Sequence, residues 1–334
     1  MCRFIFYLGT PIKLSSIITE PSHGLLAQSI HSNCPGVTLN ADGFGISWYV
    51  PEITPIPGVF KDITPAWSNI NLRQLSRVTK SGCIMAHVRA ASAGAIVNTN
   101  CHPFTYKNLS WMHNGTIPYF LKLKRDIINL CSDSAFEMIK GTTDSEVLFA
   151  LFITNYEKEI QYQTEKVKPS GVVYYSHEFN EPEEVPYSKE INNTEVLPKV
   201  LKDTIQQIHQ IVLSYEVSNG ILDDSMIEGA SLSITSAFGK LNLAVTDGKT
   251  VVASRYITGD PKCAHSLYWS RGPTIQFDKG SCRIGKCNDS PSPSPNCLVI
   301  SSEPLAQDFK CEEVPINHMV VGNAAGYFSI DPIN

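Results

Sequence analysis

Cys2 is the residue with the clearest chemical potential, because it directly follows the initiator methionine. Methionine removal normally occurs when the next residue is small, and it would leave a cysteine that carries both a thiol and a free α-amine. An α-amine has a pKa of about 7.7–8.0, so near neutral pH a useful fraction is uncharged and accepts the thiol proton, directly or through water. The sequence therefore predicts that Cys2 is a nucleophile with its own base and needs no separate histidine.

Two other polar stretches come directly after apolar segments. Arg89 follows the segment 83–88, and His113-Asn-Gly-Thr116 follows the segment 109–112. Functional side chains are often found where a regular element gives way to a loop. We therefore expect both stretches to lie near the site of Cys2, and we expect Arg3 and the segment Asp42–Gly45 to shape that site or a loop beside it.

The elements that position these residues are indicated by apolar patterns and turn signals. The run Phe4–Leu8 ends at Gly9-Thr10-Pro11 and predicts a buried strand that holds the start of the chain in the core. Thr143-Asp-Ser-Glu146 has the form of a capping box and predicts a helix over 144–161. The other expected elements are helices at 23–31, 69–80 and 197–218, strands at 44–50, 83–88, 109–112, 231–236, 240–246, 250–256, 266–270, 298–302 and 314–321, a proline-rich loop at 51–65, and a polar surface excursion at 164–195 with at most one short strand at 172–175.

This order of strands, then helices, then further strands favours an α+β fold with substantial antiparallel sheet. The chain has 334 residues, 43% of them hydrophobic and 18% charged, which is typical of a globular protein with a sizeable core. We expect a single domain over residues 2–334. No G-x-G-x-x-G or Walker A string occurs, so the sequence offers no dinucleotide site or P-loop.

Charge and cysteine spacing exclude other classes of partner. With 27 basic and 32 acidic residues the net charge is -5, which argues against nucleic acid. No run of 18 apolar residues occurs and the opening apolar stretch is too short for a signal peptide, so we expect no membrane segment, a cytoplasmic location and mostly reduced cysteines. Cys282, Cys287 and Cys297, or Cys263 with His265, lack the paired C-x2-C spacing of a zinc site, and we expect no metal.

Six motifs in order resemble the class II glutamine amidotransferases, which are N-terminal nucleophile hydrolases. They are Cys2-Arg-Phe, Asp42-Gly-Phe-Gly-Ile-Ser-Trp-Tyr49, His87-Val-Arg-Ala-Ala-Ser92, Cys101-His-Pro-Phe104, Met112-His-Asn-Gly-Thr116 and Gly141-Thr-Thr-Asp-Ser-Glu146. The resemblance covers the first 155 residues and continues more weakly through segments 244–248, 252–257 and 301–305. These later segments, with the opening motif and Ile63-Thr-Pro-Ala-Trp67, are most similar to the amidotransferase subunits of fungal glutathione-degrading complexes. The resemblance implies a four-layer αββα sandwich of mostly antiparallel sheets and no cofactor.

The resemblance also implies a role for each of five residues. Cys2 attacks the γ-carbonyl of a γ-glutamyl amide and forms a thioester that water hydrolyses. The Asn114 side chain and the Gly115 N–H stabilise the oxyanion, a place where glycine lets the backbone approach the substrate. Arg89 binds the α-carboxylate of the substrate and Asp144 its α-ammonium.

Each of these residue types also has a structural interpretation. Asn-Gly is a common turn dipeptide, and Arg89 is compatible with a structural ion pair. Asp144 in the first turn of a helix is a favourable charge against the helix dipole, which is consistent with substrate binding as well. His102 and His113 lie beside motif residues and permit a Cys–His pair, which the α-amine makes unnecessary.

The function that we expect is hydrolysis of a γ-glutamyl amide, with glutathione or a related γ-glutamyl compound as the leading substrate. Glutathione would yield glutamate and Cys-Gly, and a metallopeptidase-like protein is the expected partner. One alternative keeps the site but hydrolyses glutamine and passes ammonia to a separate acceptor enzyme. A second alternative is a catalytically silent binding subunit.

Overall fold

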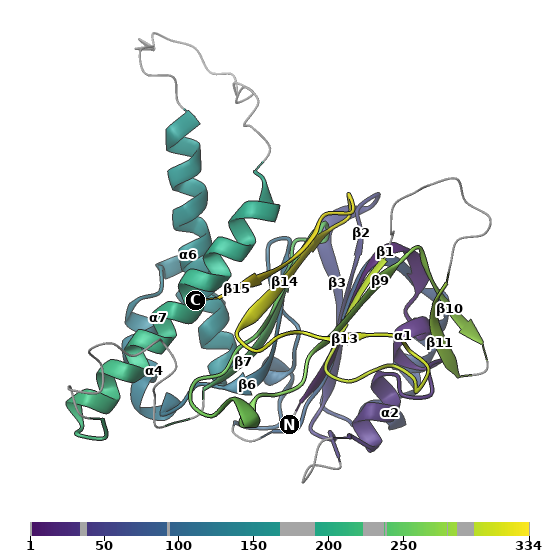
Figure 1. Ribbon diagram of the computed structural model, residues 1–334, viewed down its shortest axis with the longest axis horizontal. Coiled ribbons are helices and arrows are strands. Elements are labelled where there is room, and N and C mark those ends of the chain that lie inside the picture. Colours follow the sequence, from purple (N-terminus) through teal and green to yellow (C-terminus); the bar gives the residue numbers. More distant parts are fainter. Residues whose placement is uncertain are drawn as a thin grey trace.

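Two antiparallel sheets lie face to face and carry helices on their outer sides in the computed structural model (Figure 1). The structure describes residues 2–33, 39–91, 94–167, 191–222, 237, 239–278, 280–285 and 297–333. Sheet A contains, in spatial order, β13 (Glu312–Glu313), β9 (Tyr268–Gly272), β12 (Cys297–Ser301), β1 (Arg3–Lys13), β4 (Lys80–Val88), β2 (Phe44–Val50) and β3 (Thr54–Asp62). Sheet B contains β15 (Phe328–Pro332), β14 (His318–Asn323), β8 (Thr250–Arg255), β7 (Lys240–Thr246), β6 (Leu109–Thr116) and β5 (Phe104–Tyr106).

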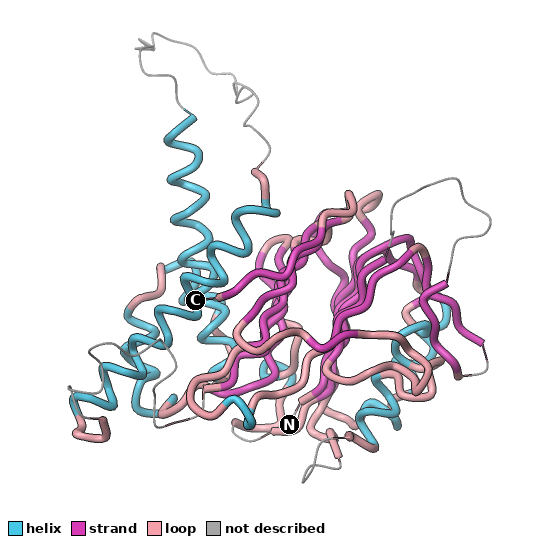
Figure 2. The backbone as a smooth tube through the Cα atoms, viewed as in Figure 1, coloured by secondary structure: helices cyan, strands magenta, loops and turns pink. Residues whose placement is uncertain are grey.

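Helices cover the outer face of each sheet, as the tube view also shows (Figure 2). Beside sheet A lie α1 (Ser15–Ile18), α2 (Leu25–Ile30) and α3 (Ile70–Val78). Beside sheet B lie α4 (Phe120–Asn129), α5 (Asp133–Met138), α6 (Asp144–Val167) and α7 (Asn193–Ser218). The remaining elements are the ribbon of β10 (Thr274–Asp278) with β11 (Ser281–Gly285) and 3-10 turns at Ala66–Ser68, Asn98–Asn100 and Pro261–Cys263.

The layer order follows from the way β1 is buried on both of its faces. Phe4 and Phe6 point into the core between the sheets, whereas Ile5 and Tyr7 point into the core between sheet A and its helices. Successive side chains of a strand alternate between faces, so a strand with both faces covered becomes a continuous apolar run. This confirms the predicted α+β class and the four-layer αββα sandwich.

β1 is longer than the sequence predicted. The strand does not end at Leu8 but continues to Lys13, with a shift of register against β4 between Leu8 and Ile12. A bulge of this kind lets a strand pass through a turn-like sequence such as Gly9-Thr10-Pro11 without losing its pairing on either side.

The predicted loop at 51–65 is wrong, because β3 occupies Thr54–Asp62 within it. β3 lies at the edge of sheet A and pairs only with β2 among the described strands. Proline cannot donate to a sheet ladder but is tolerated at an edge, so Pro55 and Pro57 did not prevent strand formation.

The two long helices are confirmed, and α6 begins where the capping motif predicted. The Thr143 hydroxyl accepts from the Glu146 N–H at 3.3 Å, which is half of a capping box. The Glu146 carboxylate instead accepts from the N–H groups of Lys140 and Gly141, at 2.9 and 2.6 Å. It therefore ties the preceding loop to the helix rather than closing the box.

The other predicted elements agree within a few residues, with two exceptions. The strand expected at 314–321 is found as β14, four residues later, and the strand expected at 109–112 runs on as β6 to Thr116. The predicted strands at 172–175 and 231–236 lie outside the described residues. The helices α1, α4 and α5 and the strands β5, β10, β11, β13 and β15 were not predicted.

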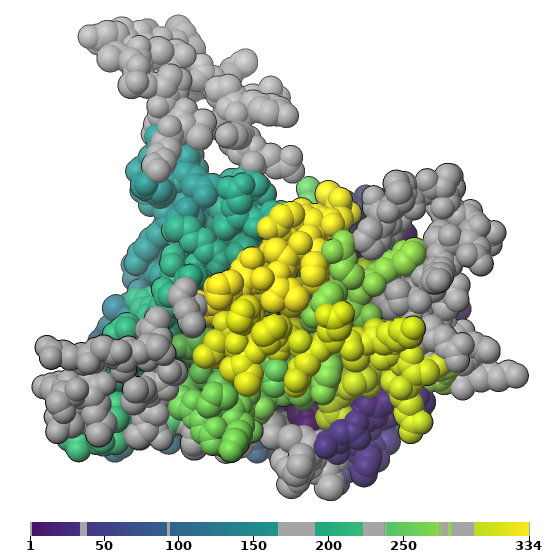
Figure 3. Space-filling view, viewed as in Figure 1, coloured from purple at the N-terminus to yellow at the C-terminus, as the bar shows by residue number. Residues whose placement is uncertain are grey.

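The C-terminal strands spread over one face of the molecule, yellow in the space-filling view, between the teal helices and the green segment around 240–272 (Figure 3). None of the helices in the described ranges combines the length and the apolar character that a membrane span requires.

Candidate active site

Strand pairing brings Cys2 and Arg89 together at one end of sheet A. Arg3 on β1 is paired with Val88 on β4, so the residue before β1 lies beside the residue after β4. The Cys2 thiol donates to the carbonyl of Ala90 at 3.6 Å. Two stretches that are far apart in the sequence and were expected to share a site are therefore neighbours.

The electrostatic environment of the Cys2 sulfur involves both of the predicted substrate-binding residues. Burial raises the pKa of the Cys2 thiol above its ordinary value, and the hydrogen bond to Ala90 and the Arg89 guanidinium oppose that rise. The Asp144 carboxylate raises the pKa further. The thiol is thus protonated near neutral pH, and a nucleophilic role requires a base.

Asn114 lies within β6 rather than after it, and its side chain is 2% exposed. The side-chain oxygen Oδ1 is buried and has no hydrogen-bond partner among the described residues. Buried amides are nearly always hydrogen-bonded in folded proteins. Asn114 is also one of the residues that line a cavity of about 540 Å³.

Gly115, the next residue of β6, has a backbone N–H that the sheet ladder leaves unused. Gly115 is paired with Leu241 on β7, but the Leu241 N–H donates to Tyr256 on the opposite side of β7, at 2.9 Å. Because hydrogen-bonded and non-bonded pairs alternate along an antiparallel ladder, the Gly115–Leu241 pair is a non-bonded one. On the other side of β6, the pairing with β5 ends at Trp111.

The need for glycine at this position comes from the neighbouring strand. A Cβ on Gly115 would lie 1.7 Å from the carbonyl oxygen of Lys240, a distance at which no side chain is accommodated. The sequence suggested that glycine allows the substrate to approach. The close approach seen here is that of β7.

Asp144 is the first residue of α6 and is anchored to the end of β6. Its Oδ2 accepts from the Ile117 N–H at 2.9 Å, and its Oδ1 accepts from the N–H of Ser145 at 2.8 Å. The carboxylate therefore occupies the position expected for a charge at a helix N-terminus. A carboxylate has about four acceptor sites, so these contacts leave capacity for an ammonium group.

Arg89 is 3% exposed and its loop is held by Asp42. The Arg89 N–H donates to the carbonyl of Gly43 at 2.9 Å, and the Asp42 carboxylate accepts from the Ala91 N–H at 2.7 Å. One guanidinium nitrogen, Nη1, donates to the carbonyl of Ala95 at 3.0 Å. The segment 42–45, which we expected to shape the site, thus positions the arginine.

Arg3 has a larger structural role than its sequence position indicated. Its Nη1 donates to the Cys2 carbonyl at 2.7 Å, and its Nε forms a buried ion pair with Glu303. Glu303 also accepts from His23 at 2.6 Å and from the Asn33 N–H at 3.0 Å. The sequence contained Glu303 in one of the weaker similarity segments but gave no indication of this cluster.

The histidines beside the motifs do not form a Cys–His pair. His113 is held by the Ser145 hydroxyl at 2.9 Å and by the Lys240 carbonyl at 3.1 Å. The His102 ring stacks on His87, with ring centroids 4.2 Å apart, and burial lowers the pKa of both histidines, that of His87 to about 3. Both rings are therefore neutral parts of the interior near neutral pH.

The described residues include no group of three or more histidine, cysteine, aspartate or glutamate side chains placed to hold a metal ion. Of the cysteines considered as ligands, Cys263 lines the large cavity together with His265, and Cys297 lies in β12. Cys287 lies outside the described residues, as does Ser92 of the third motif.

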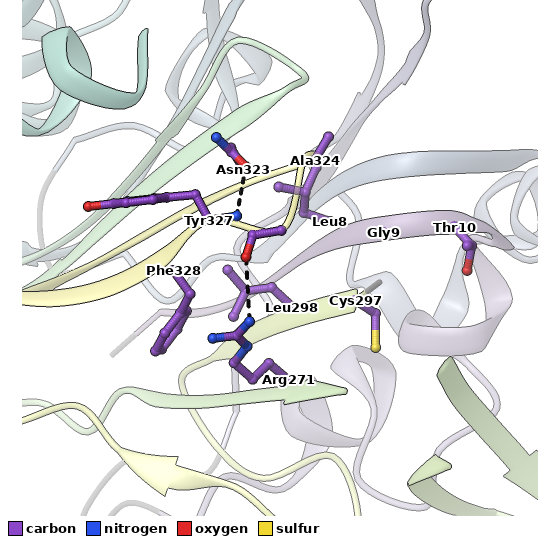
Figure 4. Close-up of a pocket in the computed structure, with 11 residues that line it drawn as sticks. Leu8, Gly9, Thr10, Arg271, Cys297, Leu298, Asn323, Ala324, Tyr327 and Phe328 are labelled. Carbon is purple, nitrogen blue, oxygen red and sulfur yellow. Dashed lines mark hydrogen bonds between the residues drawn. The ribbon is translucent and has the colours of Figure 1, made fainter. Parts of the chain in front are cut away.

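A second cavity, of about 210 Å³, lies near the other end of the apolar run of β1 (Figure 4). Arg271 enters it and stacks on the Phe328 ring, 4.6 Å from its centroid, while its guanidinium donates to the carbonyl of Gly326 at 3.5 Å. None of the five predicted site residues lines this cavity.

Comparison with known proteins identifies the family. Residues 28–182 match the family of class-II glutamine amidotransferases. A probable glutamine amidotransferase of Saccharomyces cerevisiae, DUG3, is 35% identical over 314 residues, which are 91% of this chain and 76% of that protein. A γ-glutamyl-hercynylcysteine sulfoxide hydrolase of Mycobacterium tuberculosis is 30% identical over 119 residues, which are 35% of this chain and 50% of that protein. The chain belongs to the class II glutamine amidotransferase family, as its motifs predicted, and is an amide-hydrolysing enzyme.

Solved structures of the same class share the fold. The glutamine amidotransferase class-II domain protein of Silicibacter pomeroyi has a TM-score of 0.55 and 20% identity, and the match covers 99% of both chains. The glutamine phosphoribosylpyrophosphate amidotransferase of B. subtilis has a TM-score of 0.52 and 16% identity, with coverage of 100% of this chain and 49% of that one. At these identities the similarity supports the N-terminal nucleophile architecture of two sheets between helices.

Proposed function

We propose that the protein hydrolyses a γ-glutamyl amide through a thioester on Cys2, and that glutathione or a related γ-glutamyl compound is the substrate. The observation that carries this proposal is a buried side-chain amide without a partner for its oxygen, that of Asn114, next to the Gly115 N–H that the sheet ladder leaves unused. Arg3 lines the same cavity as Asn114 and binds the carbonyl of Cys2. This link through Arg3 supports a position of the two donors beside Cys2.

The reaction begins with methionine removal, which gives Cys2 a free α-amine. The amine accepts the thiol proton as sulfur attacks the γ-carbonyl carbon, and the carbonyl oxygen becomes an oxyanion that Asn114 and Gly115 stabilise. The C–N bond then breaks, and the leaving amine takes the proton from the α-ammonium. Water attacks the resulting thioester, with the α-amine again as base, and releases glutamate.

Arg89 and Asp144 hold the glutamyl group in this proposal. A guanidinium matches the planar geometry of the α-carboxylate, and a carboxylate pairs with the α-ammonium. Both charges act on the Cys2 sulfur, one from each of the two sheet–helix halves of the sandwich. A glutamyl side chain held at its α-carbon would then present its γ-carbonyl to the thiol.

Location and partner are part of the proposal. The seven cysteines whose side chains are described are all free thiols, which supports a reducing compartment such as the cytoplasm. If the amine released is Cys-Gly, a metallopeptidase-like partner that cleaves it would complete the degradation. The M. tuberculosis relative is named as a hydrolase of a γ-glutamyl compound other than glutamine, which supports a substrate of this kind.

The test uses protein whose intact mass shows that methionine has been removed. We expect release of glutamate and Cys-Gly from glutathione to exceed ammonia release from glutamine. Cys2→Ala should abolish turnover, while the matched variant Cys131→Ala, at a partly exposed cysteine elsewhere, should retain it. A γ-glutamyl adduct on Cys2, trapped by acid quench, would support the thioester.

Undiminished turnover by Cys2→Ala contradicts the proposal. Ammonia release from glutamine that exceeds glutathione cleavage, and that rises with an acceptor enzyme, would favour the alternative of a glutamine-hydrolysing subunit. Absence of turnover with every γ-glutamyl compound, with and without a co-purified partner, would favour a silent binding subunit.

A further inference from the structure

The cavity of about 540 Å³ beside Asn114 is not explained by binding of the glutamyl group. Asn114, Arg3 and Glu303 line one side of it, and residues of the segment 262–268 line the other. Neither Arg89 nor Asp144 belongs to its lining. Cys2 and Gly115 do not belong to it either, so the cavity contacts one of the two proposed oxyanion donors and is linked to the nucleophile through Arg3, which binds the Cys2 carbonyl.

The wall formed by the segment 262–268 is firmly attached to both sheets. The carbonyl of His265 accepts from the Arg255 side chain at 2.9 Å and from the Asn242 side chain at 3.3 Å. The Ser266 hydroxyl donates to the carbonyl of Ser302 at 2.8 Å. Because these bonds join β7, β8 and the end of β12, the cavity is formed before any ligand binds.

Position assigns the cavity to one part of a γ-glutamyl substrate. The carbon attacked by Cys2 carries two groups, the glutamyl chain and the departing amine. With the glutamyl chain directed toward Arg89 and Asp144, and the oxyanion at Asn114, the amine lies on the remaining side. A cavity that contacts Asn114 but not the two glutamyl-binding residues is the space that the amine side would occupy.

The cavity is much larger than ammonia needs, so its volume indicates a larger departing amine. A cavity needs about 10–15 Å³ of such volume to hold one water molecule, and ammonia is of similar size. The volume of about 540 Å³ is within the range of cavities that bind whole small molecules. It accommodates a dipeptide.

Charge indicates which dipeptide end is recognised. Arg3 is neutralised by its ion pair with Glu303. Burial opposes ionisation of Glu303, but hydrogen bonds from His23 and Asn33 and the charge of Arg3 outweigh it and hold its pKa at about 2. Burial lowers the pKa of His265 to about 3, so this side chain is neutral. Among the described lining residues Lys262 therefore supplies the net positive charge.

We infer that this cavity is a subsite for the departing amine, and that it selects γ-glutamyl peptides whose amine part is of dipeptide size and ends in a carboxylate that pairs with Lys262. The inference rests on the proposed γ-glutamyl hydrolysis and specifies its substrate class. Hydrolysis of glutamine needs no occupant in this space.

The kinetic test compares γ-glutamyl-cysteinyl-glycine with its C-terminal amide and with glutamine, using the wild type, Lys262→Ala and the exposed control Lys122→Ala. For the free acid, we expect Lys262→Ala to raise KM roughly 3- to 10-fold and to leave kcat nearly unchanged. The C-terminal amide should show the raised KM already with the wild type and no further change in Lys262→Ala. Equal KM values for acid and amide with the wild type, or the same effect on glutamine as on the acid, would overturn the inference.

A second measurement does not depend on turnover. In the Cys2→Ala variant, alkylation of Cys263 by iodoacetamide is followed by peptide mass spectrometry, since this free thiol lines the cavity. We expect the S-methylated γ-glutamyl tripeptide, which has no thiol to consume iodoacetamide, to slow the alkylation of Cys263 and glutamine to leave it unchanged. Failure of the tripeptide to protect Cys263 while the wild type still hydrolyses it would refute the subsite alone. Protection without any turnover by the wild type would instead refute the proposed hydrolysis.

Discussion

Arg3 and Glu303 form a buried ion pair between residues 300 positions apart, and the same arginine binds the carbonyl of Cys2. The pair joins the first residue of β1 to the loop that follows β12. Both strands are central members of sheet A. The proposed nucleophile is therefore positioned by a contact that connects the two ends of the chain.

Glu303→Gln is expected to lower the free energy of unfolding by about 3–5 kcal/mol, because it leaves the buried Arg3 charge without a counterion. Urea unfolding measures the change, with Glu312→Gln on the exposed edge strand β13 as the control. The double variant Arg3→Met with Glu303→Leu should lose less than Glu303→Gln alone. A loss below about 1 kcal/mol for Glu303→Gln would show that the ion pair is not a main source of stability.

Asn114→Ala is expected to reduce kcat about 100- to 1000-fold, the effect of removing one oxyanion donor. KM should change much less, because the contact forms only as charge develops on the oxygen. The side-chain oxygen has no hydrogen-bond partner among the described residues, so stability should fall by about 1 kcal/mol or less. Asn129→Ala, exposed at the end of α4, is the control. A kcat within threefold of the wild type would remove Asn114 from the oxyanion site.

Asp144→Asn should raise KM for γ-glutamyl substrates roughly 10- to 100-fold, since a charged hydrogen bond to the α-ammonium contributes about 1.5–3 kcal/mol. Asp133→Asn is the matched control, because Asp133 is likewise the first residue of a helix and carries a first-turn charge. Steady-state kinetics and urea unfolding of both variants separate substrate binding from helix stabilisation. If the two variants lose stability alike and KM is unchanged in both, Asp144 has only the helix role.

Acid should destabilise the protein through its buried neutral histidines. Burial lowers the pKa values of His87 and His265 to about 3, below the ordinary value of about 6.5. Between these two pH values both histidines are protonated in the unfolded chain but neutral in the folded chain. The stability is fully present above pH 6.5 and is lost as the pH falls toward 3, at up to about 1.4 kcal/mol per pH unit for each histidine. Urea midpoints between pH 7 and 4 measure the slope.

The His87→Leu variant should show a shallower slope over the same pH range. The two ring nitrogens of His87 have no hydrogen-bond partner among the described residues, so replacing the ring with an apolar side chain breaks no such bond. His31→Asn at an exposed position should keep the wild-type slope. An unchanged slope in His87→Leu would mean that this histidine is not a source of the acid sensitivity.

Most of the fold could be predicted from local patterns, and the exceptions have physical reasons. The run Phe4–Leu8 was recognisable because both faces of a central strand are buried. β3 was missed because an edge strand tolerates the prolines that usually argue against a strand. The bulge in β1 depends on pairing with β4, which no local pattern reveals.

The motifs indicated the residues of the candidate site but not the contacts that hold those residues in place. The motifs indicated Cys2 and Arg89, and strand register places them side by side. They did not indicate that Gly115 is required by the carbonyl of Lys240, or that Arg3 pairs with Glu303. Those contacts join positions more than 100 residues apart and arise only when the neighbouring strands of each sheet have paired.

The pairing of β1 with β12 has a consequence for synthesis of the protein. Cys2 leaves the ribosome long before β12 and Glu303, which hold it in place and are made about 300 residues later. A nascent or prematurely terminated chain thus carries the Cys2 thiol without β12 and Glu303, which hold it in position. We expect such chains to be inert toward cellular thiol peptides, and competence to appear only once translation has passed residue 303.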